Sequence, residues 1–516
     1  MFAMSLQPYP AIAPFPERIR PAPTTGQSAP ESGYERFDQR RWSPQVMIMR
    51  SPPRLSKHNP SSFQRSVLRI AALCGFALTL TAWPTRLAAA DRNEDTSRAH
   101  ADASMLERAK FQRIEPLRAQ GKTTNMPGVF DSIVNDTGGV RSLLADHDLH
   151  LSGLVSSGLT YNILDNGVPR DPQAYTGQQL TYSGSFNVFA NLKIAGENKD
   201  ISQLNISVSS QYSSYIGVGP EKDLVLGTLD YFHSFFDRAV EINLGFTDNI
   251  SRFVAIFAGG NPLMAAGYAA TIPVEVGLSA SPVATPTFNI CFNGKSGFYN
   301  KTGVQRSLIP SARGLLEEAD AYDSGLRFSQ KGAKAIFINE TGFKRSASPT
   351  KKQMWLRVGG IYNTSDYQRF DGGTMDNWAL YALGDYQLAQ TRAGEPYRGL
   401  YIGASCLYGP SEINLYCRYY EARVYGIGLL PGRPTDLVNL TFAYNGFSRE
   451  AIDAYAERTF GTVVTQRNQY SASLLYSCHL ARGIYLGTSV TYLVHPTFIG
   501  DFEPALNESL KTTLLF

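Results

Sequence analysis

NESLKTTLLF, residues 507–516, ends the chain, and its apolar and polar residues alternate up to a terminal phenylalanine. Successive side chains of a β-strand point to opposite faces, so this segment would have one apolar face ending at Phe516 and one polar face. Leu515 is the one apolar residue on the polar face. An aromatic residue that closes such a pattern is typical of the last strand of a bacterial outer-membrane β-barrel.

The same alternation recurs upstream, in segments that are long for a soluble protein. Leu180–Ile194 has apolar residues at nearly every even position and polar residues at nearly every odd one. Soluble strands average about 5–6 residues, whereas crossing a bilayer at a tilt takes about 9–11. The polar faces carry mostly uncharged Ser, Thr, Asn and Gln, which suits a water-filled lumen. Further segments with this pattern are Asp148–Leu164, Gln203–Gln211, Val240–Thr247, Met354–Asn363, Val438–Gly446, Tyr470–Leu480 and Ile484–Val494.

The chain is therefore predicted to be an all-β protein, a transmembrane antiparallel β-barrel over residues 138–516. A barrel of about 16 strands suits this length. Aromatic residues make up 12% of the chain, which agrees with aromatic girdles at the two membrane interfaces. Residues 91–137 are the expected periplasmic N-terminal segment, with a helix-like stretch at Ser104–Leu117.

Residues 59–90 have the features of a secretory signal peptide. Arg65 and Arg69 precede the uncharged run Ile70–Trp83, and an Ala-Ala-Ala site ends at Ala90. A basic region, a short apolar core and a small-residue cleavage site are the parts of such a signal, and the apolar run is too short for a spanning helix. We expect cleavage after Ala90.

Residues 1–58 are a Pro- and Arg-rich extension whose composition predicts disorder. Either the start codon is assigned too early, with Met47 or Met49 as the true start, or the signal is an extended one. Residues 1–90 hold 11 Lys and Arg against 4 Asp and Glu, so the rest of the chain has a net charge of −3 although the whole chain has +4. The mature chain therefore has no basic surplus of the kind that nucleic-acid binding requires.

Residues 248–320 form the longest stretch without regular alternation. The stretch contains Gly259-Gly260-Asn261-Pro262 and the Pro-, Ala- and Ser-rich Ala270–Pro286, and part of it could be strand. Loops this long are usually functional or mobile. It would either fold into the lumen as a constriction or stay outside. Short turns such as Gly196–Asp200 are expected on the periplasmic side.

Two motifs before residue 390 resemble those of carbohydrate-selective porins of the OprB type. Gly138–Leu149 is similar to the Gly-Gly-x-Arg-x-x-Leu stretch that leads into the first strand of that family. Tyr381–Leu388 resembles the family's Asp-Gln strand, although Tyr386 separates the acid from the amide.

Two further motifs lie nearer the C-terminus. Gly426–Asp436, followed by the strand Leu437–Phe447, closely resembles the family's Gly-Leu-x-Pro-Gly-Arg-x-x-Asp turn and strand. Tyr492–Pro496 stands where the family has a Tyr-Val-x-Asn-Pro stretch, with His495 in place of Asn.

The resemblance implies a 16-stranded porin in the outer membrane of a Gram-negative bacterium. It also implies passive, carbohydrate-selective diffusion of glucose-type sugars, so mono- or small oligosaccharides are the expected substrates. The alternation indicates the barrel, whereas the sugar follows only from the resemblance. A general, weakly selective porin for small hydrophilic solutes and ions is the alternative function.

Sugar recognition in a pore combines a flat aromatic ring with charged or amide groups for the hydroxyls, and binding must stay weak enough for release. The lumen candidates with such side chains are Lys193, Glu241, Trp355, Arg357, Arg418 and Arg423. For each of them, a solvated wall position without a specific contact is the favoured alternative. Arg433 and Asp436 flank a Pro-Gly turn that their opposite charges would pin, and Arg141 would anchor the N-terminal segment. A pore role is the alternative for these three.

The sequence indicates no other chemistry. The His residues have no metal-ligand spacing, and we find no Gly-x-Ser-x-Gly elbow or phosphate loop, so we expect no metal, no cofactor and no enzymatic activity. Cys406 and Cys417 flank a turn and could pair in the oxidising periplasm, although pairing about that turn sets Cys406 opposite Leu415. Expected partners are outer-membrane lipid and the barrel-assembly machinery, which would bind the strand ending at Phe516. A homo-oligomer is possible.

Overall fold

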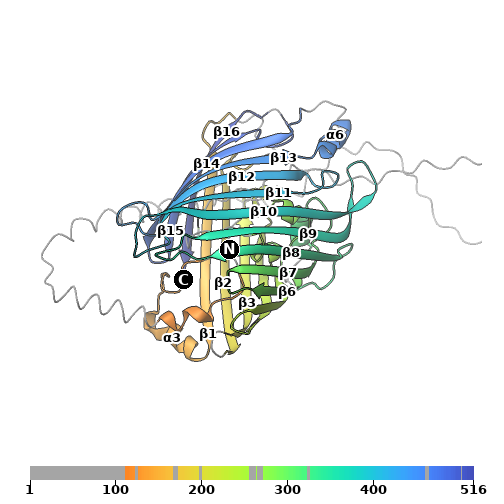
Figure 1. Cartoon of the computed structure of the whole chain (residues 1–516). Helices are drawn as coiled ribbons and strands as arrows, with labels where there is room; N and C mark the ends of the chain where they lie inside the picture. Colours follow the sequence, from red (N-terminus) through yellow and green to blue (C-terminus); the bar gives the residue numbers. More distant parts are fainter. Residues whose placement is uncertain are drawn as a thin grey trace, which may run out of the picture. The chain divides into compact units, whose positions relative to one another are not determined.

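Strand β1 (Leu149–Asn162) pairs antiparallel with both β2 (Thr181–Ala195) and β16 (Ala505–Leu515), which closes the sheet in this computed structural model. In the part of the chain that the structure describes, 16 strands follow one another around the wall in chain order (Figure 1). Each strand is antiparallel to both of its neighbours. The predicted 16-stranded antiparallel barrel is confirmed.

The structure describes residues 111–122, 126–166, 173–196, 200–254, 263, 271–321, 326–458, 464–500 and 502–516. The other strands are β3 (Ser202–Ser213), β4 (Lys222–Phe235), β5 (Val240–Thr247), β6 (Thr285–Asn293), β7 (Phe298–Arg306), β8 (Ala335–Arg345), β9 (Met354–Gln368), β10 (Thr374–Gln390), β11 (Gly399–Tyr408), β12 (Tyr416–Ile427), β13 (Leu437–Phe447), β14 (Asn468–Ala481) and β15 (Ile484–Val494). The helices and 3-10 turns are η1 (Glu115–Leu117), η2 (Thr137–Gly139), α3 (Val140–Asp146), η3 (Ile216–Val218), η4 (Asn249–Ser251), α4 (Thr271–Glu275), α5 (Gly314–Asp320) and α6 (Arg449–Arg458).

The expected extension, signal peptide and residues 91–110 lie outside the described residues. Of the helix-like stretch expected at Ser104–Leu117, the described part ends in η1, and the short helix α3 comes directly before β1. None of the helices in the described ranges is long and apolar enough to cross a membrane.

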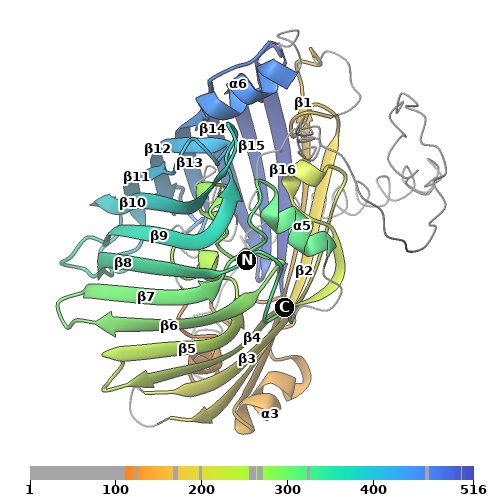
Figure 2. The ribbon, with the colours of Figure 1, turned by 90° about the vertical axis from the view of Figure 1, so that its right-hand side faces the viewer.

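The two ends of the barrel differ in their connections. Where β1 begins and β16 ends, the connections are short, such as residues 482–483 between β14 and β15. The opposite end has the longer connections, including residues 248–284 between β5 and β6. Outer-membrane barrels have short periplasmic turns and longer extracellular loops, so we assign the first end to the periplasm. Helices α3 and α6 lie at opposite ends of the strands (Figure 2).

Side chains alternate between the lumen and the outer surface as the sequence predicts. On β2, Asn187 and Asn191 are buried on the inner face, whereas Phe186 and Leu192 are exposed on the outer face. Leu515 is the apolar exception on the inner face of β16, and it packs there against Leu154 of β1 and the ring of Tyr485. The exception therefore fills an apolar cluster inside the periplasmic end of the barrel.

The irregular stretch expected over residues 248–320 contains two full strands. β6 and β7 occupy its middle and pair with each other from Thr287 to Tyr299. The outer face of β6 carries Phe288 and Phe292, but the outer face of β7 carries the polar residues Asn300 and Thr302, which hides the alternation. What remains irregular is the β5–β6 loop (residues 248–284) and the β7–β8 loop (residues 307–334).

The terminal aromatic ring packs on the outer surface over a glycine. Phe516 stacks on Phe186 with ring centroids 6.1 Å apart, and its amide donates to the carbonyl oxygen of Gly153 at 3.0 Å. A Cβ atom on Gly153 would lie 2.1 Å from the Phe516 ring. The ring therefore needs a residue without a side chain beneath it.

Replacing Gly153 with alanine is expected to displace the Phe516 ring and to lower the free energy of unfolding by about 1–3 kcal/mol, the usual cost of overpacking. Urea unfolding in lipid vesicles, followed by heat-modifiable gel mobility, measures the change. Gly394→Ala is the matched control, because no atom lies within 4 Å of its added Cβ. Equal stability of both variants would contradict the packing argument.

Candidate functional site

The β5–β6 loop folds into the lumen. Backbone carbonyl oxygens of the loop accept hydrogen bonds from side chains on the inner wall: Arg252 from Lys301 at 2.9 Å, Phe253 from Arg357 at 2.8 Å, Val276 from Asn363 at 2.7 Å and Glu275 from Asn377 at 3.3 Å. These donors lie on β7, β9 and β10. The sequence left open whether this stretch folds into the lumen or stays outside. The described part of the loop lies in the lumen.

The inner wall makes this placement possible because it supplies donors. A loop buried inside a barrel must satisfy its backbone carbonyls without help from a strand ladder. Helix α4 is wholly buried, and the Glu275 carboxylate at its end accepts a hydrogen bond from the backbone amide of Tyr416 on β12 at 3.0 Å. The β7–β8 loop follows it inward, with the Leu308 amide donating to the Gly277 oxygen at 3.0 Å. The polar wall thus holds a constriction in place.

Arg252 is the point at which three parts of the molecule meet. Its Nη2 donates to the Asp230 carboxylate on β4 at 2.9 Å, and its Nη1 donates to the carbonyl oxygen of Gly121 at 3.1 Å. Asp230 also accepts from the Asn205 amide on β3 at 2.8 Å. One guanidinium therefore connects the wall, the extracellular loop and the N-terminal segment.

Sequence reasoning missed Arg252 and Asp230. Arg252 lies in a stretch without periodicity, although it is the only basic residue between 248 and 284. A lone basic residue in such a stretch was the one available signal. Asp230 stands on a strand that the alternation analysis did not identify.

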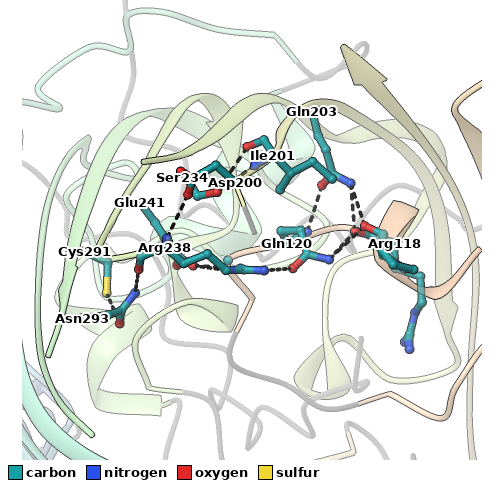
Figure 3. Close-up of polar contacts among 12 residues, drawn as sticks. Arg118, Gln120, Asp200, Ile201, Gln203, Ser234, Arg238, Glu241, Cys291 and Asn293 are labelled. Atoms are coloured by element: carbon teal, nitrogen blue, oxygen red, sulfur yellow. Dashed lines mark hydrogen bonds and ion pairs between the residues drawn. The ribbon is translucent and has the colours of Figure 1, made fainter. Parts of the chain in front are cut away.

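Lys193 and Glu241 lie on inner faces at the periplasmic end. The Lys193 ammonium is 3.8 Å from the Asp148 carboxylate. Glu241 accepts two hydrogen bonds from the guanidinium of Arg238, at 2.9 and 2.8 Å (Figure 3). Both side chains keep part of their surface exposed at this end of the barrel.

Trp355 and Arg357 lie on the inner face of β9 but are not free for a ligand. The Trp355 ring is 2% exposed, its Nε1 donates to the Tyr299 hydroxyl at 2.9 Å, and the Arg357 guanidinium lies 3.8 Å from the ring centroid. Glu340 is 3.8 Å from Arg357 and accepts hydrogen bonds from the hydroxyls of Tyr299 and Tyr381. This cluster packs the wall under the β5–β6 loop.

Arg423 is a buried ion-pair centre on the inner face of β12. Its guanidinium donates to Asp385 on β10 at 3.0 and 2.8 Å, to the Ser405 hydroxyl at 2.8 Å and to Glu421 at 2.5 Å. The Tyr425 hydroxyl donates to the same Asp385. The arrangement joins β10, β11 and β12 across the wall.

The prediction of a lumen position for Arg418 is wrong. Residues 419, 421, 423 and 425 are buried on the inner face of β12, whereas Arg418 is exposed on the same outer face as Tyr420. Arg418 and Arg423 are five positions apart, and side chains an odd number of residues apart on one strand point to opposite faces. The two arginines therefore could not share the lumen.

Asp436 and Arg433 connect the turn before β13 to β14. Asp436 accepts hydrogen bonds from the Tyr476 hydroxyl at 2.6 Å and the His479 amide at 2.9 Å, and lies 3.9 Å from the Arg433 guanidinium. Arg433 donates to the His479 carbonyl oxygen at 3.2 Å. These contacts support the structural role over the pore role, and they reach the next strand as well as across the turn.

Arg141 is buried in α3, which packs against β1. Burial lowers the pKa of its guanidinium, and the nearby Asp136 opposes this shift. This position supports an anchoring role. Cys406 is exposed and lies opposite Tyr420 in the strand register, whereas Cys417 is buried, and both are free thiols.

The chain matches one family model and is similar in fold to solved porin structures. The model of the carbohydrate-selective porin, OprB family, matches residues 177–516. The high-pH structure of Pseudomonas putida OprB is similar to this chain with a TM-score of 0.64 and 17% identity, over 76% of this chain and 99% of that one. Its low-pH structure has a TM-score of 0.47 and 16% identity, over 75% and 98%. A mutant porin of Rh. blastica has a TM-score of 0.42 and 9% identity, over 71% and 100%. No curated protein sequence matches the chain.

Replacing Arg423 with glutamine is expected to leave Asp385 and Glu421 buried without their cation. Breaking a buried pair in this way costs about 3–5 kcal/mol. Arg418→Gln, on the outer face of the same strand, should change the free energy of unfolding by less than about 0.5 kcal/mol. Urea unfolding in lipid vesicles measures both, and a similar cost for the two variants would contradict the assignment of faces.

Proposed function

This chain belongs to the OprB family of carbohydrate-selective porins, and we propose that the constriction made by its β5–β6 loop selects sugars of the size of glucose. Members of this family are porin barrels of the outer membrane of Gram-negative bacteria. Diffusion through the lumen is passive and selective for carbohydrates. The proposal adds where in this chain the selection occurs.

The position of the β5–β6 loop carries the proposal. An open 16-stranded barrel would leave an aqueous channel, and a loop bound across its inner wall narrows that channel. Contacts to β4, β7, β9, β10 and β12 fix the loop on several sides of the lumen. Because these contacts hold the loop in the lumen, the width of the channel stays fixed and can select solutes by size.

Partly exposed polar side chains at the periplasmic end of the lumen supply the weak contacts that a sugar needs. Lys193, Arg238 and Glu241 retain exposed fractions of 31%, 36% and 14% on the periplasmic side. Charge-assisted hydrogen bonds to hydroxyl groups are directional, and a few of them suffice where release must remain fast. The two sequence candidates among them, Lys193 and Glu241, therefore remain in the proposed sugar path.

The outer surface fits a lipid environment. Exposed apolar side chains on the outer faces include Leu244, Val358, Leu380 and Phe442. We expect the strand ending at Phe516, whose ring lies on this surface, to be the segment that the barrel-assembly machinery binds. A homo-oligomer would cover part of the same apolar surface.

Glucose titration of the ionic current through the mature protein in planar bilayers tests the proposal. Saturable block by glucose, weaker for a trisaccharide, is the expected result. Block by no sugar would leave the barrel intact and would favour the general, weakly selective porin instead.

The variant Arg252→Lys locates the constriction. A lysine keeps the charge but cannot hold Asp230 and the Gly121 oxygen with separate nitrogens, so the loop should loosen. We expect a higher single-channel conductance and an increase of about tenfold in the half-saturating glucose concentration, which corresponds to about 1.4 kcal/mol. Arg345→Lys, at the end of β8 outside the lumen, is the control. Unchanged block in Arg252→Lys would place the selection elsewhere.

A further inference from the structure

We propose that the N-terminal strap, residues 115–122 and 126–131, forms the periplasmic part of the size filter, with Gln120 and Gly121 as specificity-determining residues. The proposal rests on the proposed function and assigns part of the selection to a segment that precedes the barrel. The segment lies before the residues that the family model matches, which begin at residue 177.

Both ends of the strap are fixed at its base. The Glu115 carboxylate accepts a hydrogen bond from the Val129 amide at 2.8 Å, which brings residues far apart in the strap together. Phe111, Ile114 and Val129 are buried in one apolar cluster, against which Phe130 packs. The two described parts of the strap are therefore joined at its base.

Asp131 attaches the strap to the periplasmic rim of β14 and β15. Its carboxylate accepts hydrogen bonds from the Gly483 amide at 2.6 Å, from the His479 imidazole at 2.9 Å and from the Tyr485 hydroxyl. Burial alone would raise the pKa of Asp131, but these hydrogen bonds outweigh it and lower the pKa. The carboxylate is thus held ionised and bound to the barrel.

The strap then follows the inner wall. Met126 packs on the apolar cluster inside the barrel that includes Leu154 of β1 and Leu515 of β16. The Lys122 ammonium lies 5.4 Å from the ring centroid of Phe189, which is on the inner face of β2. Asp131 therefore contacts the rim of β14 and β15, Met126 contacts the cluster of β1, β15 and β16, and Lys122 contacts β2.

Gln120 joins the strap to β3 and to the β4–β5 turn (Figure 3). The backbone amide of Gln120 donates to the Gln203 side-chain oxygen at 3.3 Å. The side-chain oxygen of Gln120 accepts a hydrogen bond from the Arg238 guanidinium at 2.9 Å. Gln203 in turn donates to the carbonyl oxygens of Leu117 and Arg118 at 3.1 and 3.2 Å. Arg238 is oriented by Glu241, so this sequence candidate acts on the strap through Arg238.

Gly121 brings the strap against the constriction. Its carbonyl oxygen accepts the hydrogen bond from Arg252, which belongs to the loop that enters from the extracellular side. Gly121 has a φ of +72°, and an added Cβ would lie 2.8 Å from both the Arg252 guanidinium and the Phe232 ring. A residue with a side chain would be strained and would push these groups apart. The lumen is therefore narrowed from both ends, and the two parts share one arginine.

The test compares sugar permeation in proteoliposomes by swelling rate, with glucose, a disaccharide and a trisaccharide as probes. Gln120→Ala removes the contact to Arg238, and Gly121→Val separates the strap from Arg252 and Phe232. Gln390→Ala is the matched control, because its amide binds the turn carbonyls of Ser348 and Lys351 at the periplasmic end away from the strap. Heat-modifiable gel mobility confirms that each barrel is folded.

We expect both strap variants to raise the rate of the disaccharide relative to glucose by at least about threefold, with the control unchanged. If Gly121→Val does not fold, Gln120→Ala decides alone. Suppose that the wild type discriminates among the sugars but folded Gln120→Ala has the same ratio of disaccharide to glucose rates. This result overturns the role of the strap and leaves the proposed function standing. A wild type that does not discriminate among the sugars overturns both.

Discussion

Backbone hydrogen bonding between β1 and β16 is the constraint on which the rest of the structure depends. In hydrocarbon an unpaired backbone group costs several kcal/mol, so a spanning sheet has to close. The register that closes it pairs Leu154 with Leu515 and Asn162 with Asn507. Because side chains alternate, a slip of one residue would turn the polar side chains of the slipped strand toward lipid. Closure therefore fixes the face on which each wall residue lies.

A closed wall with a polar inner face can then hold a loop. The asparagine, arginine and lysine side chains that alternate inward bind the carbonyl oxygens of the β5–β6 loop. Such residues would be a solvated surface in an open pore, but here many of them are structural. The same holds for Trp355 and Arg423, whose partners Tyr299 and Asp385 are protein groups two strands away in the wall. The pore is lined by what remains exposed after these contacts are made.

The sequence contained most of the fold, because alternation is a local property. It predicted the barrel, the inward position of Leu515 and the inner faces of Lys193, Glu241, Trp355, Arg357 and Arg423. The prediction for Arg418 was wrong because Arg418 and Arg423 are an odd number of residues apart on one strand, so only one of them can face the lumen. The contacts of the constriction were out of reach for another reason: Gly121 and Arg252 are 131 residues apart, and neither belongs to a periodic segment. The strand pattern also does not reveal which wall side chains the β5–β6 loop covers.

The central claim is that wall side chains hold the β5–β6 loop in the lumen and so set the width of the pore. The most direct test is the single-channel conductance of the double variant Asn363→Ala with Asn377→Ala, which removes two wall donors to the loop. We predict a larger conductance than in the wild type, with weaker block by glucose. A folded double variant with the conductance and sugar block of the wild type would contradict the account.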